Sequence, residues 1–131
     1  MQNNSFIDGY NEKFNEYANK LAAGFFSRIR VDLDNIKSKS SGLILDKFNH
    51  IDRIITDDNK NNYDKVKLTG SILMDITPDL LSQPNEDLKK SGVNIINGLF
   101  EVARKTEDSE LMQTAKSIAD SAQKAGATSK S

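Results

Sequence analysis

Residues 7–37, IDGYNEKFNEYANKLAAGFFSRIRVDLDNIK, predict one long amphipathic helix. Apolar side chains recur in this stretch at spacings that place them on one side of a helix with 3.6 residues per turn. The residues of this stripe are Ile7, Tyr10, Phe14, Tyr17, Leu21, Phe25, Ile29 and Ile36. Continuing the series at strict heptad spacing reaches Gly24 and Arg28. The pattern therefore favours a bundle helix over a long two-stranded coiled coil.

Several residues of the same stretch do not fit this single stripe. Phe26, Val31 and Leu33 lie outside it, while Arg28 and Asp32 interrupt it and stand four residues apart, close enough to pair. A helix with two apolar sides usually has neighbours on both, so we expect a partner here, unless the helix lies at the centre of its own bundle. Small residues of the last helix would admit a second close contact. The candidate partner contacts are Phe26, Arg28, Asp32, Leu33, Ala115 and Ala122.

Two shorter helical patterns follow. The first begins near residue 43 and ends at the Asp- and Asn-rich run 57–62, whose short polar side chains favour loops and caps. The second covers 63–75. Thr77 and Pro78 then predict a new helix start, with threonine as the cap and proline in the first helical position.

The last two helical patterns predict a C-terminal hairpin. The first covers 85–105, after the interruption at residues 82–84, with acidic residues in its first turn and basic residues in its last. A polar corner at 106–109 leads into a helix that ends near residue 126. Residues 1–126 are thus expected to form one all-α domain, a small bundle of about five helices with a long N-terminal helix. Residues 127–131 are expected to form a frayed tail.

Composition limits the function classes. The 131 residues suit one domain, and 37 % apolar with 28 % charged residues suits a modest core or a fold completed by self-association. The chain has no cysteine, which excludes disulfides, thiolate metal sites and cysteine nucleophiles. The longest apolar run, residues 21–26, is too short to cross a bilayer, and no leader pattern is visible. We therefore expect a cytoplasmic protein with no membrane partner.

The sequence contains no complete pattern for catalysis or for metal binding. His50 is the single histidine, and it has no metal-ligand spacing with neighbouring carboxylates. Residues 57–62 match the start of a calcium loop, but Leu68 stands where the bidentate glutamate is required, so we expect no calcium binding. Nucleophile elbows and glycine-rich phosphate loops are missing from the sequence. We therefore expect neither an enzyme nor a cofactor.

The function that remains is binding through surface complementarity. We expect a non-enzymatic helical interaction protein, of an inhibitor or immunity, chaperone, or phage or plasmid accessory type, that binds a protein partner and forms a homo-oligomer. The alternative is a DNA-associated helical oligomer of the small-terminase kind, although the net charge of −1 gives no general attraction to nucleic acid. The residues expected to form the core are Phe14, Leu21, Phe25, Phe48, Ile51, Leu99 and Phe100.

Overall fold

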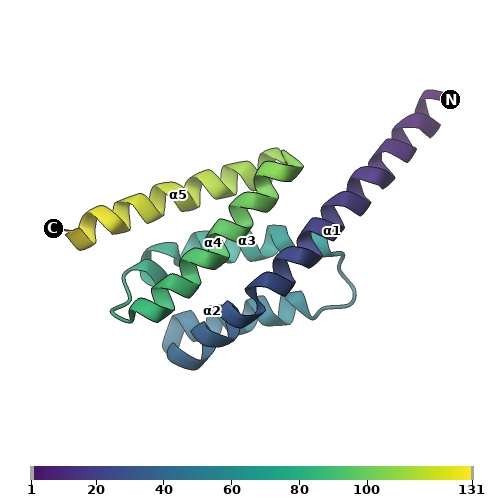
Figure 1. Cartoon of the computed structure of the whole chain (residues 1–131). Coiled ribbons are helices and arrows are strands. Elements are labelled where there is room, and N and C mark those ends of the chain that lie inside the picture. Colours follow the sequence, from purple (N-terminus) through teal and green to yellow (C-terminus); the bar gives the residue numbers. More distant parts are fainter. Residues whose placement is uncertain (1, 131) are drawn as a thin grey trace.

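A computed structural model describes the backbone of residues 2–130 and the side chains of residues 13–124. The chain forms five α-helices, and no strand occurs within residues 2–130. The helices are α1 (Gln2–Lys39), α2 (Gly42–Ile55), α3 (Asn62–Leu81), α4 (Glu86–Thr106) and α5 (Ser109–Lys130) (Figure 1). They account for 88 % of the residues, which confirms the all-α bundle predicted from the sequence.

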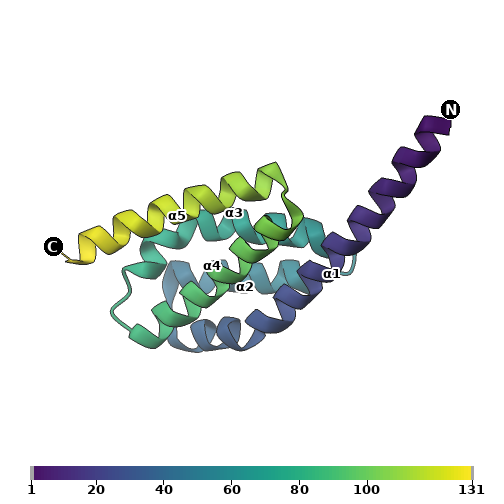
Figure 2. The same cartoon turned by 45° about the horizontal axis from the view of Figure 1, so that its top comes forward.

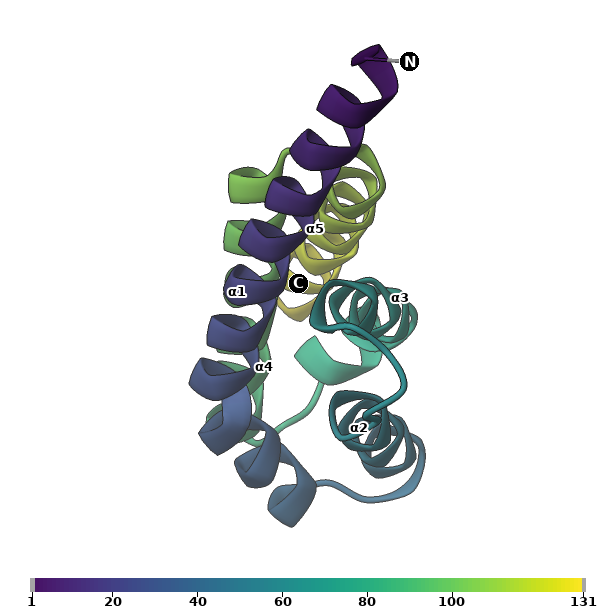
Figure 3. The same cartoon turned by 90° about the vertical axis from the view of Figure 1, so that its right-hand side faces the viewer.

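The helix at the centre of the bundle is α3. It contacts each of the other four helices, whereas α1 contacts α2, α3 and α4. Seen from the end, α1 and α4 lie side by side in one layer, with α2 and α3 in the next (Figure 3). The helix α5 covers α3 and α4, and α1 extends beyond the rest of the bundle at its N-terminal end (Figures 1 and 2). The central position considered for the first helix is thus taken by α3.

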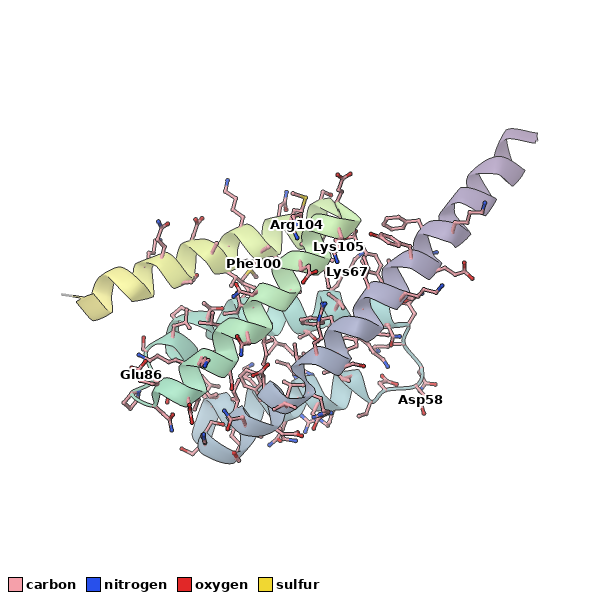
Figure 4. The ribbon with its side chains drawn as sticks, in the orientation of Figure 1. Asp58, Lys67, Glu86, Phe100, Arg104 and Lys105 are labelled. Carbon is pink, nitrogen blue, oxygen red and sulfur yellow. The ribbon has the colours of Figure 1, made fainter. Side chains whose placement is uncertain are left out.

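Four of the seven predicted core residues are fully buried. These four residues are Phe25, Phe48, Ile51 and Leu99. The prediction is wrong for Phe14, Leu21 and Phe100, which are half-buried. Phe100 lies on the part of α4 that borders α5 (Figure 4). In α1 the buried side is turned away from the predicted stripe, because Ala18, Ala22 and Leu33 are fully buried while Tyr17 is 48 % exposed.

Residues outside the α1 stripe have different environments. Leu33 is fully buried, because it lies four residues after Ile29 and three before Ile36 and so shares their buried side of α1. Val31 is 76 % exposed. Phe26 is half-buried, with its ring centroid 5.4 Å from that of Phe25. The second apolar side of α1 is therefore partly filled by the chain itself.

The structure corrects the helix start expected at Thr77 and Pro78. The helix α3 continues through both residues and ends at Leu81. Proline removes one backbone hydrogen bond and costs about 3 kcal/mol inside a helix. This cost is offset by packing, since Ile76 and Leu80 are buried on either side of the proline. The Thr77 hydroxyl caps nothing, and donates instead to the Leu73 carbonyl at 2.5 Å.

Two glycines of α4 let its neighbours approach closely. A Cβ atom at Gly98 would lie 2.9 Å from the ring of Phe25, and one at Gly92 would lie 2.7 Å from the side chain of Leu80. Real Cβ atoms do not show such short contacts. The contacts of α4 with α1 and with α3 therefore depend on the absence of a side chain at these positions.

Candidate interaction surface

A groove lies between α4 and α5 at the end of the molecule where these helices separate. The two helices meet at a tight corner, where Glu107 adopts a left-handed conformation with φ 54° and Asp108 accepts a hydrogen bond from the Leu111 amide at 3.0 Å. From this corner they diverge in a V, with α3 behind them (Figures 1 and 2). The open end has a volume of about 420 Å³, and we call it the α4–α5 groove. Its lining residues are Leu81, Glu86, Lys89, Lys90, Val93 and Ala122.

The α4–α5 groove combines an apolar floor with a charged rim. Val93 is 41 % exposed, and Leu81 and Ala122 are half-buried. On the rim, Lys89 Nζ lies 2.9 Å from Glu86 Oε1, and Figure 4 shows Glu86 at the outer end of α4. Lys90 is exposed and forms no salt bridge with the side chains of residues 13–124. Apolar surface bordered by charges is typical of a protein-binding surface.

Apolar residues extend the groove toward the corner of the V. Phe100 follows Val93 by seven residues, which is two helical turns, so it lies on the same side of α4. On α5, Ala115 is half-buried and packs against the core, and Ala119 between it and Ala122 is exposed. Residues three and four apart share one side of a helix. The groove is therefore continued toward the corner by a longer apolar strip.

The predicted partner contacts do not form one surface. Arg28 and Asp32 do not pair with each other, because α4 supplies a partner to each of them. Arg28 Nη1 lies 3.7 Å from Glu101 Oε2, and the Asn94 amide donates to Asp32 Oδ1 at 3.3 Å. Ala122 lines the α4–α5 groove.

The remaining predicted contacts lie elsewhere. Leu33 is buried within the bundle and is not available to a partner, while Phe26 is half-buried in α1. Ala115 lies seven residues, or two turns, before Ala122 on α5, on the strip that continues the groove. The structure thus separates the two α5 residues from the four α1 residues, and it adds Leu81, Lys90 and Val93, which the sequence analysis did not select.

The basic residues near the end of α1 are bound to carboxylates. Arg30 Nη2 lies 3.1 Å from Asp34 and 3.0 Å from Asp52, and Lys37 Nζ lies 2.6 Å from the same Asp52. Burial acts to raise the pKa of Asp52, but hydrogen bonds from Lys37 and Arg30 outweigh it and lower the pKa. Lys39 is 2.8 Å from Asp87. These pairs partly neutralise the positive charges of Arg30, Lys37 and Lys39.

A second polar cluster joins α1, α3 and α5. The Tyr63 hydroxyl donates to Asp108, and the Tyr63 amide donates to the Asn19 side chain at 2.9 Å. Lys67 Nζ lies 4.8 Å from the centre of the Tyr63 ring, and the Phe14 ring meets that ring edge-on at 6.0 Å. Burial raises the pKa of Tyr63, and the Asp108 carboxylate adds to this shift. The cluster fixes the start of α5 rather than offering an open site.

The connection between α2 and α3 is closed by its own side chains. Asp57 accepts from the Asn59 amide at 2.9 Å, and Lys60 Nζ lies 3.5 Å from the same carboxylate. These contacts lower the pKa of Asp57, with the Asn59 amide as the main cause. Lys65 is buried and donates to the Ile55 carbonyl at 2.8 Å. Within residues 13–124, no three histidine, aspartate or glutamate side chains lie close enough to hold a metal ion.

No family model matches the chain, and neither a curated protein nor a solved structure shows significant similarity to it. Among the described residues, no helix combines the length and the apolar character needed to span a membrane.

Proposed function

We propose that this chain is a non-enzymatic helical interaction protein and that its α4–α5 groove binds a helical segment of a protein partner. The observation that carries the proposal is the exposed apolar floor at Val93, Leu81 and Ala122, bordered by Glu86 and Lys90. Helices that bind in grooves place an apolar face on such a floor, and their flanking charges meet the rim.

The proposed partner is a protein rather than nucleic acid. Four bases of the α1 patch, Arg28, Arg30, Lys37 and Lys39, each lie within 4 Å of a carboxylate, so few of their charges are free for phosphates. A DNA-associated oligomer would need basic surface from elsewhere. An inhibitor or immunity protein, a chaperone, or a phage or plasmid accessory factor acting in the cytoplasm are the kinds of protein that fit this proposal.

Capture of partners with matched variants tests the groove. We expect Val93→Glu to abolish binding, because it places a charge on the apolar floor, which is unfavourable without a partner charge. Val31→Glu is the matched control, since Val31 is also an exposed valine, at 76 %, but lies on α1 outside the groove. Tagged wild-type and variant chains would be expressed in the native host, and retained proteins would be quantified by mass spectrometry.

The result that supports the proposal is a protein retained by the wild type and by Val31→Glu but not by Val93→Glu. Untagged copies of the chain itself count as a partner in this comparison. Retention that is equal for all three chains, or that fails for all three, would contradict binding in the groove. Circular dichroism of both variants establishes that loss of binding is not loss of folding.

A further inference from the structure

The first described side chains of α1 include an apolar stripe that its own bundle covers only in part, since Phe14 packs on Tyr63 but Tyr17 is left open. Figure 1 shows this part extending past the corner between α4 and α5, and no contact joins α1 to α5 among the described residues. Tyr17 is 48 % exposed, and its neighbours Phe14 and Leu21, on the same side of the helix, are half-buried. Helices depend largely on covering such a side for their stability. The stripe of Phe14, Tyr17 and Leu21 therefore has exposed apolar surface that a second molecule can cover.

One flank of this stripe carries charges of alternating sign. Lys13, Glu16 and Lys20 follow one another at spacings of three and four residues, next to Tyr17 on the helix surface. All three side chains are exposed. In the part of the chain whose side chains are described, none of the three forms an ion pair. The flank thus offers a positive, negative, positive pattern that has no ion-pair partner among the side chains of residues 13–124.

The rim of the α4–α5 groove complements that pattern. Glu86 and Lys90 stand four residues apart along α4, with the apolar floor beside them. A helix lying along α4 in either direction brings Glu16 to Lys90 and brings Lys13 or Lys20 to Glu86, because the intervals of three and four residues match. The volume of about 420 Å³ accommodates side chains rather than a whole helix.

We infer that the α4–α5 groove of one copy of the chain receives residues 13–21 of α1 from a second copy, with Tyr17 seated over Val93 and Leu81. The inference rests on the proposed function, since it names the segment that the groove binds. The contact joins two different surfaces, so it closes either as a reciprocal pair of chains or as a ring.

Mixing two variants tests the contact. Tyr17→Glu removes the inserted side chain, and Val93→Glu removes the floor, so each variant alone should sediment as a 14.6 kDa monomer. Together they should form a species of twice that mass, because one chain supplies an intact α1 and the other an intact groove. Sedimentation velocity at micromolar to submillimolar concentration measures both. Val31→Glu is again the control and should assemble like the wild type.

Charge exchange sharpens the test of the rim. Lys90→Glu and Glu16→Lys should each weaken self-association at least about tenfold, whereas the double variant should recover most of the loss. A monomeric wild type, a mixture that stays monomeric, or assembly lost in Tyr17→Glu but kept in Val93→Glu would overturn the inference. A protein partner lost with Val93→Glu in the capture experiment would still support the proposed function, so the two failures are distinguishable.

Discussion

The two sides of α4 differ in how completely they are filled. Toward α1, the ring of Phe25 lies over Gly98, and Asn35 Nδ2 donates to Ser91 Oγ at 2.8 Å across the same interface. On the side toward α5, the α5 residues that face the open end of α4 are small, and Val93 of α4 remains 41 % exposed. On α5 only Leu111 and Ile118 are large and fully buried among its described side chains. The side of α4 that faces α1 is closely packed, whereas the side that faces α5 leaves apolar surface available to a second molecule.

This difference separates residues that stabilise the fold from residues available for binding. A closely packed interface leaves no surface for a partner, and a substitution in it lowers the stability of the fold. An open edge contributes little to stability, and a substitution there changes the affinity for the partner that binds it. Variants on the two sides of α4 should therefore affect different measurements.

The largest effect is expected at Phe25. Phe25→Ala should lower the free energy of unfolding by about 3–5 kcal/mol, because the side chain is fully buried against Gly98 and leaves a cavity. Phe26→Ala, at the next position and half-buried, should cost less than about 2 kcal/mol. Urea denaturation followed by circular dichroism measures both. Equal losses in the two variants would mean that the α1–α4 interface is not closely packed.

The next effect is expected from a pair of glycines. Gly98→Ala should destabilise the protein by about 1–3 kcal/mol, because the new methyl group would overlap the Phe25 ring. Gly24→Ala has the same chemistry in a helix with no atom within 4 Å, so it should stabilise the protein by about 0.5–1 kcal/mol. Thermal melts of both variants would show whether each substitution raises or lowers the stability of the protein. Two shifts in the same direction would count against the close approach of α1 and α4.

A smaller effect is expected at the start of α5. Burial acts to raise the pKa of Asp108, but hydrogen bonds from the Tyr63 hydroxyl and the Leu111 amide outweigh it and lower the pKa. A lowered pKa in the folded state gives stability that is present above the unfolded value near 3.9 and is lost as the pH falls through the folded value.

Asp108→Asn removes the charge and keeps an acceptor for only one of the two donors, because the Tyr63 hydroxyl and the Leu111 amide donate to different oxygens of the carboxylate. It should therefore cost about 1 kcal/mol at pH 7, and its stability should fall less steeply than that of the wild type as the pH is lowered below 5. Urea denaturation at a series of pH values provides the comparison. The same pH slope in both chains would show that Asp108 is not held ionised by these contacts.

The smallest effect on stability is expected at the open edge. Val93→Glu should change the free energy of unfolding by no more than about 0.5 kcal/mol, since the valine is largely outside the core. The same variant should lose binding. A stability loss as large as that of Phe25→Ala would mean that Val93 belongs to the core and that the two sides of α4 are alike.

Much of the helical structure could be predicted from local patterns. The polar run 57–62 marked the end of α2, and Asn85 accepts from the Leu88 amide at the start of α4 as a helix cap. Pro78 misled the prediction because local chemistry favours a helix start there. The burial of Leu80, two residues further on, keeps α3 continuous, and the close contact of Leu80 with α4 depends on Gly92, fourteen residues beyond the proline.

The groove could not be predicted in the same way. Leu33 and Val31 were both expected outside the α1 stripe, yet Leu33 is fully buried and Val31 is 76 % exposed. Leu33 shares the buried side of Ile29 and Ile36, at spacings of four and three residues, whereas Val31 points away from it. The groove combines the end of α3, the start of α4 and the far half of α5, which only the tertiary arrangement brings together.

Hydrogen exchange at two protein concentrations tests most directly whether the open edge of α4 is where this molecule binds. Concentrating the chain should slow exchange of the amides in residues 81–93, in residues 115–124 and in residues 13–21, while the amides of α2 should exchange as before. This is the pattern expected if the α1 segment of one copy covers the α4–α5 groove of another. Protection that appears in α2, or that leaves residues 81–93 unchanged while the chain assembles, would contradict it.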